Sequence, residues 1–325
     1  MVRMTESKKQ KWLLSRLLIP AGILPPVVKY DDLKFNEENR AQVGNSGFEY
    51  YYLLEQNPML VTKGPIKNKI FVLHAPWPEF NHSTTMNPIV GKIVEKIIFG
   101  KNKLPTDFKK MCQKSFTMAK ILGARSVTLH IRFFDHSRLA EQLEFLSRTE
   151  KEFNIRANIE HDGTDIFLNL KRGAKYLKIN GSIDWMLDPR KMLKVIDQFS
   201  PNKNFTICFD TAPHISTGMP LMENLEATYD RISHVHLAST LKGQDLPTDL
   251  NLPIFTEIVK FLFDKHYQGY ITVESNGAVG PEEERIAKIY AASSIAGLSI
   301  LKKKTITNAQ KHIYNSCQYL LENFC

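Results

Sequence analysis

The sequence contains few cysteines and no long apolar run. Its cysteines are Cys112, Cys208, Cys317 and Cys325. They include no Cys-x-x-Cys pair and no pairing rhythm, which argues against a disulfide framework and predicts a reducing, cytoplasmic compartment. No stretch of 18 apolar residues occurs, so we expect no membrane partner.

The chain also lacks the tracts that nucleic-acid-binding proteins often carry. It has no serine–arginine or glycine–arginine tract and no basic stretch with interleaved aromatics. The formal net charge is nevertheless +9, with a pI near 9.2, and the obvious basic clusters are residues 8–11 and 302–304. A positive charge attracts anionic partners such as phosphorylated metabolites. Charge alone does not establish nucleic-acid binding, which is therefore the less favoured partner.

What the sequence does contain is a polar residue at the end of one short apolar run after another. The six runs end at His74, His130, Glu160, Asp210, His236 and Glu274. Such short apolar runs are typical of buried parallel strands. In a (β/α)₈ barrel, metal ligands and catalytic groups lie at the C-terminal ends of the strands. The pattern therefore predicts an enzyme, but it does not by itself identify the reaction.

Strand-like and helix-like segments alternate from about residue 46 onward. Helices are predicted at 105–122, 137–152, 189–199, 222–231, 254–266, 281–301 and 308–321. Seven strands are readable, and we place the eighth around residues 14–24. This alternation predicts a parallel sheet wound by crossovers, and the length suits a single α/β barrel.

The predicted fold class is α/β, a single (β/α)₈ TIM barrel with additions at both ends. Residues 1–30 contain three prolines and look irregular, so we predict an N-terminal extension there. The barrel is predicted over residues 31–305, with a longer insertion at 163–185. Residues 306–325 are predicted to be an extra C-terminal helix packed on the barrel.

With their neighbours, the strand-end residues resemble the xylose-isomerase-like barrel superfamily, which includes sugar-phosphate isomerases and epimerases and endonuclease IV. The matching pieces are His74-Ala75-Pro76-Trp77, Leu129-His130, Ile159-Glu160, residues 209–218, Val235-His236-Leu237 and Val273-Glu274. The resemblance covers about residues 46–300. Each motif is short, so the resemblance depends on their order and placement.

The resemblance implies a divalent cation held by Glu160, Asp210, His236 and Glu274. Three carboxylates and one imidazole form a hard, mainly oxygen site, which suits Mn²⁺, Mg²⁺ or Co²⁺, with Zn²⁺ also compatible. Taken singly, each residue has a simpler explanation, such as a helix N-cap, a loop carboxylate or a core histidine.

In the isomerases and epimerases of this superfamily, the substrate is a small sugar-type molecule. The resemblance implies that Glu160 and Glu274 act as paired acid and base groups that also touch the metal. His214 would then bind a substrate hydroxyl. Lys242 would meet a substrate phosphate, although a solvated loop lysine is the simpler explanation.

The alternative is an endonuclease IV-like hydrolase. That resemblance implies a second ion held by His74 and His130, with Glu160 as the bridging ligand. Its third ion needs a histidine where this sequence has Pro213, so the sugar chemistry is favoured. A barrel that binds without turnover is a further alternative, and self-association into a homo-oligomer is left open.

Overall fold

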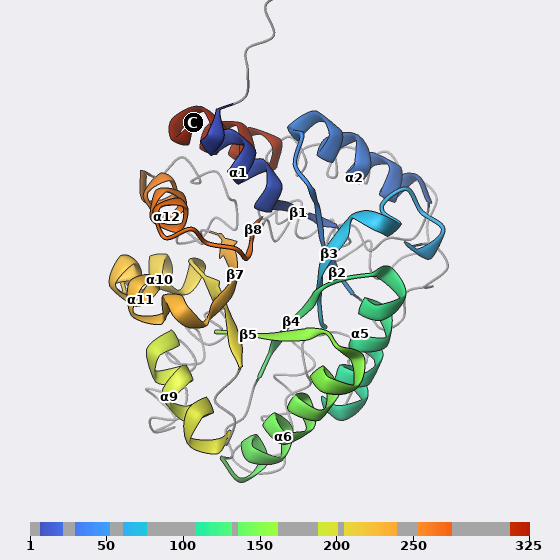
Figure 1. Cartoon of the computed structure of the whole chain (residues 1–325), viewed down its shortest axis with the longest axis vertical. Helices are drawn as coiled ribbons and strands as arrows, with labels where there is room; N and C mark the ends of the chain where they lie inside the picture. Colours follow the sequence, from blue (N-terminus) through green and yellow to red (C-terminus); the bar gives the residue numbers. More distant parts are fainter. Residues whose placement is uncertain are drawn as a thin grey trace, which may run out of the picture.

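The computed structural model describes residues 7–21, 30–52, 61–76, 108–131, 136–161, 188–200, 205–238, 253–274 and 313–325. Within these residues a closed barrel of eight parallel strands is formed, in which each strand pairs with the next along the chain (Figure 1). The strands are β1 (Leu17–Ala21), β2 (Gly47–Tyr51), β3 (Ile70–His74), β4 (Ser126–His130), β5 (Arg156–Glu160), β6 (Thr206–Asp210), β7 (Ile232–Leu237) and β8 (Tyr270–Val273). The predicted (β/α)₈ barrel is confirmed.

Helices surround the ring of strands (Figure 1). They are α1 (Lys8–Arg16), α2 (Tyr30–Val43), α5 (Phe108–Leu122), α6 (His136–Phe153), α9 (Pro189–Phe199), α10 (Ala212–Thr217), α11 (Leu221–Thr228), α12 (Pro253–Asp264) and residues 313–324, with short 3₁₀ turns η1 (Lys67–Lys69) and η2 (Tyr229–Arg231). The helix predicted at 281–301 lies outside the described residues. The other predicted helices each have a counterpart, and their ends agree within a few residues wherever those ends are described. No helix in the described part of the chain is long and apolar enough to cross a membrane. The predicted insertion at 163–185 lies outside the described residues.

Local sequence explains where α9 begins. The side chain of Asp188 accepts hydrogen bonds from the backbone N–H groups of Arg190 and Lys191, and so caps the first turn. Pro189 occupies the first helical turn, where a missing N–H costs nothing. The predicted start of this helix is therefore confirmed.

The N-terminus confirms one prediction and corrects another. The strand predicted around residues 14–24 is β1, which pairs with both β2 and β8. The prediction of an irregular extension is wrong for residues 8–21, because they form α1 and β1. Pro20 made this segment look irregular in the sequence. The pairing of β1 with β8 ends at Leu18, so the N–H that Pro20 lacks removes little from the sheet.

The helix at residues 313–324 packs against the outside of the barrel, as predicted. Its Phe324 ring lies 6.0 Å from the ring of Trp12 and 5.6 Å from that of Phe263, measured between centroids. Lys9 Nζ donates to the carbonyl oxygen of Phe324 at 3.2 Å. This helix therefore packs against both α1, which carries Trp12, and α12, which carries Phe263 (Figure 1).

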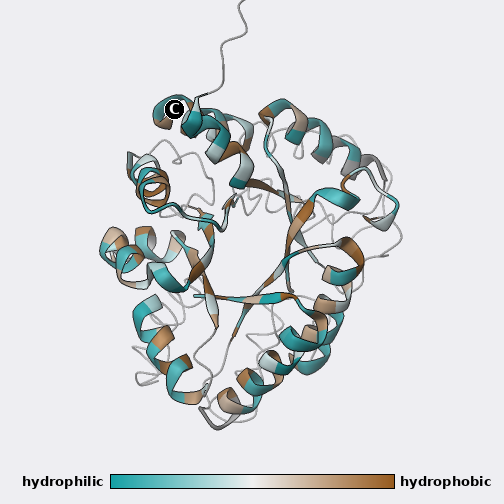
Figure 2. Cartoon of the chain, viewed as in Figure 1, coloured by the Kyte–Doolittle hydropathy of each residue, from teal (hydrophilic) through white to brown (hydrophobic). Residues whose placement is uncertain are grey.

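The inside of the barrel is unusually polar. Hydrophilic residues are interspersed along the barrel strands (Figure 2). The fully or almost fully buried polar side chains on the strands include Glu49, Thr128, Asn158, His234 and Thr272. Layers of branched aliphatic residues fill most barrels of this type. Buried polar groups are costly unless they have partners, and His234 illustrates how they find them, since Thr128 Oγ1 and Thr272 Oγ1 lie 3.3 and 2.8 Å from its ring nitrogens.

Replacing Leu17 by alanine tests whether β1 is an integral strand. Leu17 is fully buried, so Leu17→Ala should lower the free energy of unfolding by about 2–5 kcal/mol, measured by urea denaturation. Ile121→Ala is the control, because Ile121 is 49% exposed and its loss should change the free energy by less than about 0.5 kcal/mol. Equal, small effects of the two changes would contradict the assignment of β1 to the barrel.

Candidate active site

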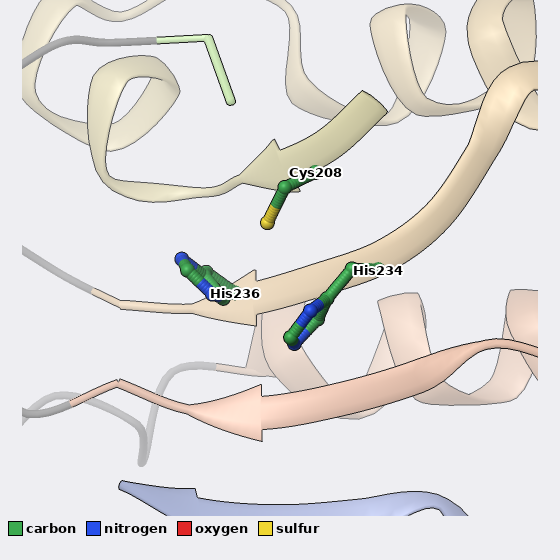
Figure 3. Close-up of side chains that lie close together, drawn as sticks. All are labelled: Cys208, His234 and His236. Atoms are coloured by element: carbon green, nitrogen blue, oxygen red, sulfur yellow. The ribbon is translucent and has the colours of Figure 1, made fainter. Parts of the chain in front are cut away.

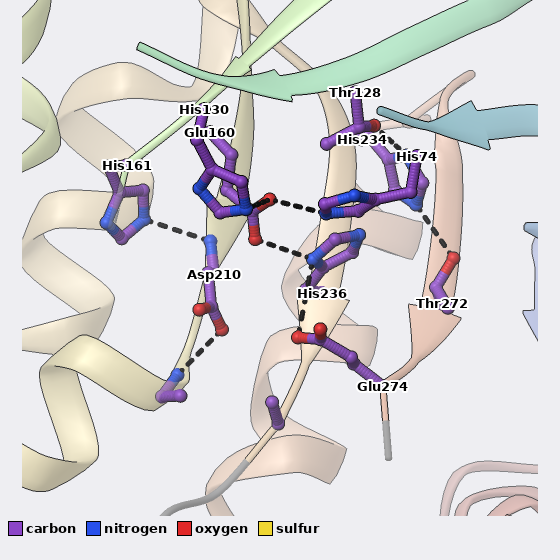
Figure 4. A network of polar contacts seen from close by, with 12 residues as sticks. His74, Thr128, His130, Glu160, His161, Asp210, His234, His236, Thr272 and Glu274 are labelled. Carbon is purple, nitrogen blue, oxygen red and sulfur yellow. Dashed lines mark hydrogen bonds and ion pairs between the residues drawn. The ribbon is translucent and has the colours of Figure 1, made fainter. Parts of the chain in front are cut away.

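The six strand-end residues meet at the carboxyl end of the barrel. Five of them lie at the ends of strands β3 to β7, namely His74, His130, Glu160, Asp210 and His236. The sixth, Glu274, follows β8 directly. Figure 4 shows their side chains pointing toward one another. All carboxyl ends of a parallel barrel face the same way, so residues separated by 200 positions in the chain become neighbours.

Glu160 is the centre of this arrangement. Its Oε2 lies 3.0 Å from His74 Nε2 and 3.1 Å from His130 Nε2, while its Oε1 lies 2.8 Å from His236 Nδ1. Burial alone would raise the pKa of the Glu160 carboxyl. The charges of His130 and His236, with hydrogen bonds from His236 and His74, instead hold that pKa well below its ordinary value. Glu160 is therefore a carboxylate surrounded by imidazoles.

Glu160 also belongs to a group of three carboxylates with Asp210 and Glu274. One oxygen of each lies within 4.8 Å of the others. Burial raises the pKa of Asp210 well above its ordinary value, and repulsion from Glu274 and Glu160 raises it further. The pKa of Glu274 is also raised, chiefly by burial. Three carboxylates forced together in a buried place repel one another unless positive charge is supplied.

The hydrogen bonds of His74 test whether this donor set suits a cation. His74 Nδ1 lies 2.9 Å from the carbonyl oxygen of Ala75 and must donate to it, so in the neutral ring Nε2 carries a lone pair. That lone pair faces Glu160 Oε2, which is also an acceptor. The facing lone pairs need a proton or a metal ion between them. With three carboxylates beside them, the residues present fit a divalent cation.

The sequence interpretation missed two residues of the site, Glu49 and Tyr51, which lie on β2. The Tyr51 hydroxyl donates to Glu274 Oε1 at 3.1 Å, and its ring stacks on His74 with centroids 4.5 Å apart. Burial and the charge of Glu274 keep the pKa of Tyr51 well above its ordinary value, so the phenol remains a donor. The strand was predicted, and its alternation places Glu49 and Tyr51 on one face. That alternation was the available signal.

Glu49 lies beneath His236 inside the barrel and is fully buried. Its Oε2 is 2.9 Å from His236 Nε2 and 3.5 Å from His234 Nε2. Burial would raise the pKa of this carboxyl, but the charges of His236 and His234 lower it to about 2. Glu49 is therefore a second buried carboxylate next to His236.

Cys208, His234 and His236 form a buried group on the neighbouring strands β6 and β7 (Figure 3). A ligand atom of each lies within 4.8 Å of the others. Both ring nitrogens of His234 are occupied by the hydroxyls of Thr128 and Thr272. Burial raises the pKa of the Cys208 thiol well above its ordinary value, which disfavours the thiolate that a metal requires. We interpret this group as the support beneath the site.

His214, predicted to bind substrate, is buried in α10. Its Nδ1 donates to the carbonyl oxygen of Asp210 at 3.2 Å, and its Nε2 accepts from Asn224 Nδ2 at 3.0 Å. Burial lowers the pKa of His214 to about 4, so the ring is neutral. A substrate hydroxyl would have to displace one of these bonds. The structure therefore gives His214 a bracing role at the end of β6.

Two further residues complete the account of the predicted site. His161, which follows β5, accepts a hydrogen bond at Nε2 from the backbone N–H of Asp210 at 2.9 Å, so it also braces the end of β6. Lys242, predicted to meet a substrate phosphate, lies outside the described residues.

A hollow lies at the opposite, amino end of the barrel. It measures about 940 Å³ and is lined by residues from the starts of β4 to β8, including Arg125, Arg156 and Tyr270. Arg125 donates to the Tyr270 hydroxyl at 2.7 Å, so these side chains already bond each other. None of the six strand-end residues lines it. In barrels of this kind the chemistry occurs at the carboxyl end, so the hollow does not compete as the active site.

Solved structures share this fold at low sequence identity. A D-allulose 3-epimerase from Methylomonas sp., in complex with D-allulose, matches with a TM-score of 0.52 and 14% identity, over 83% of this chain and 88% of that chain. A sugar phosphate isomerase/epimerase from Parabacteroides distasonis has a TM-score of 0.52 and 11% identity, over 99% and 96%. A probable 3-DHS dehydratase from Bacillus anthracis has a TM-score of 0.51 and 13% identity, over 85% and 96%.

The sequence itself has a match at the level of a family. A search of curated proteins finds no match. The family model described as xylose isomerase-like TIM barrel matches residues 99–292, which is more than half of the 325 residues. With the closed eight-stranded barrel in place, the chain belongs to the xylose isomerase-like TIM barrel family.

Proposed function

We propose that the protein is a divalent-metal-dependent isomerase or epimerase of a small sugar or sugar derivative. The observation that carries this proposal is the convergence of the Glu160, Asp210 and Glu274 carboxylates with the His236 ring at the mouth of the barrel. Family membership supports it, as do two sugar isomerases or epimerases among the solved structures with this fold.

Glu160, Asp210, Glu274 and His236 Nδ1 would hold the cation. This set of three carboxylates and one imidazole suits Mn²⁺, Mg²⁺ or Co²⁺, with Zn²⁺ also compatible. When bound, such an ion polarises the oxygens of a hydroxy-carbonyl substrate and acidifies the neighbouring C–H bond.

Glu160 and Glu274 would move the proton. Glu160 is ionised because the imidazoles lower its pKa, so it would take the proton from the carbon beside the carbonyl group. Glu274 has a raised pKa and would deliver a proton to the other face or to the neighbouring carbon. One proton leaves the substrate and one returns, so the reaction is a net isomerisation. Tyr51, which donates to Glu274 Oε1, orients that carboxyl group.

The alternative is a two-metal hydrolase of the endonuclease IV type. The observation in its favour is that His74 and His130 both direct Nε2 at Glu160 Oε2, as a second ion with a bridging carboxylate would require. A binding barrel without turnover is the weaker alternative, since it gives no reason for three buried carboxylates to converge.

We also propose a cytoplasmic location and a small-molecule partner. The four cysteines are free of disulfides, and Cys112, Cys208 and Cys317 are buried. This agrees with a reducing compartment.

Metal binding is the first test. The purified protein should bind about one Mn²⁺ per chain in isothermal titration calorimetry. Loss of an outer-shell partner of a metal typically weakens binding about 10–100-fold. Asp210→Asn removes a proposed ligand, so it should weaken Mn²⁺ binding by more than that. Glu150→Gln is the matched control, because Glu150 lines the hollow at the opposite end of the barrel and its change should leave the affinity unaltered. A wild-type protein that binds no divalent ion would overturn the proposed function.

Proton transfer is the second test. Incubation with ketohexoses such as D-allulose in D₂O should place deuterium on the carbon beside the carbonyl group, detected by NMR. Glu274→Gln should slow this exchange by about 10²–10⁴-fold, because it removes a general acid and base. Tyr51→Phe deletes only the hydrogen bond to Glu274 and should have a smaller effect. Phosphodiester cleavage without any exchange would instead support the hydrolase.

The number of ions separates the two chemistries. An isomerase predicts one Mn²⁺ per chain in both the wild type and His130→Ala, by elemental analysis after dialysis. A two-metal hydrolase predicts two ions in the wild type and one in the variant, because His130 Nε2 would be a ligand of the second ion.

A further inference from the structure

A carboxylate in the middle of a barrel needs an explanation. Glu49 lies midway along β2 and is fully buried, where an ion loses its hydration. Its Oε2 is 2.9 Å from His236 Nε2, and its Oε1 has no hydrogen-bond partner within the described part of the chain. A leucine would fill the same space without this cost. The contact with His236 is therefore the feature that Glu49 provides.

The proton on His236 Nε2 is the one that Glu49 holds. A carboxylate only accepts hydrogen bonds, so His236 Nε2, 2.9 Å from Glu49 Oε2, is an N–H donor. Nδ1 lies at the mouth, 2.8 Å from Glu160 Oε1 and 3.5 Å from Glu274 Oε2, and in the absence of a metal ion it also donates to a carboxylate. A cation among these carboxylates would take the place of the Nδ1 proton, while Glu49 keeps the proton on Nε2.

We propose that Glu49 is a positioning residue, which fixes the tautomer and the ring orientation of His236 so that Nδ1 serves as the metal ligand. This inference rests on the proposed function, because it assigns Glu49 a task toward the same metal. Outer-shell carboxylates that accept the second N–H of a ligating histidine act in this way in many metal sites.

His234 does not share the task. It lies 3.5 Å from Glu49 Oε2, beyond a good hydrogen bond, and its two nitrogens face Thr128 and Thr272 instead. The His234 ring packs at 84° to the His236 ring, with centroids 4.8 Å apart. The His234 ring limits where the His236 ring can lie, while Glu49 keeps the proton on His236 Nε2.

The test compares changes in the same buried layer of the full-length chain. Glu49→Leu keeps the volume and removes the acceptor, so His236 can place its proton on Nδ1 and donate it to Glu160. We expect the Mn²⁺ affinity to fall about 10–100-fold in titration calorimetry. Glu49→Gln keeps an acceptor oxygen without the charge and should lose several-fold. Thr272→Val breaks the bond to His234 at an equally buried position but leaves the Glu49–His236 contact in place, so it should weaken the affinity less than Glu49→Leu does.

A second measurement reads the tautomer directly. Long-range ¹H–¹⁵N NMR spectra of the metal-free protein should show a proton on His236 Nε2 in the wild type and in Glu49→Gln. In Glu49→Leu the Nε2 proton should be lost, and the proton on Nδ1, which faces Glu160, should remain. If Glu49→Leu fails to fold, Glu49→Gln decides, because unchanged affinity together with unchanged His236 chemical shifts would overturn the inference.

The outcomes separate this inference from the proposed function. Wild-type protein that binds Mn²⁺ with the same affinity as Glu49→Leu would disprove the role of Glu49 and leave the proposed function standing. Wild-type protein that binds no divalent ion would remove the proposed function. In that case the NMR tautomer still reports whether Glu49 holds the His236 ring.

Discussion

The contact of one buried carboxylate, Glu160, with three imidazole rings is the interaction on which the site depends. Its two oxygens lie 2.8–3.1 Å from nitrogens of His74, His130 and His236. An ionised carboxylate in a closed barrel is stable only when hydrogen bonds and opposite charge replace its lost hydration. The parallel barrel supplies these partners, since β3, β4 and β7 all end at the same face as β5. The charge of Glu160 therefore fixes how four strand ends are arranged.

The same constraint extends into the interior of the barrel. Every polar side chain that points inward must find its partner there, as His234 does between Thr128 and Thr272. The apolar burial that stabilises the fold comes mainly from the contact between the strands and the surrounding helices, with Ala157 and Ile159 on the outward face of β5. Stability and chemistry thus occupy opposite faces of the same strands. A change inside the barrel can alter the site while the outer contacts remain.

The barrel and its strand ends were predictable because both follow from local patterns. An apolar run followed by His130 or Asp210 is visible in sequence, and Asp188 with Pro189 marks the start of α9. The strand around residues 14–24 was predicted, but Pro20 contributed to the wrong expectation of an irregular N-terminal extension. Its missing N–H costs little because the pairing of β1 with β8 ends at Leu18. Glu49 escaped because it lies in mid-strand rather than at a strand end. The bracing role of His214 depends on Asn224, ten residues away, and no local pattern shows that contact.

The protonation of His74 bears on how many ions the site needs. Tyr51 stacks on this ring and Ala75 accepts its Nδ1–H, so Nε2 is fixed toward Glu160. Burial alone would lower the pKa of His74, but the hydrogen bond and charge of Glu160 raise it above its ordinary value. A proton on Nε2 therefore satisfies this side of Glu160 without a second ion. The Asp210 and Glu274 carboxylates accept from the Ala212 N–H and the Tyr51 hydroxyl, but burial and their mutual repulsion still raise the pKa of Asp210. Under the proposed function the demand for a cation therefore lies on their side, which favours one metal and the sugar chemistry.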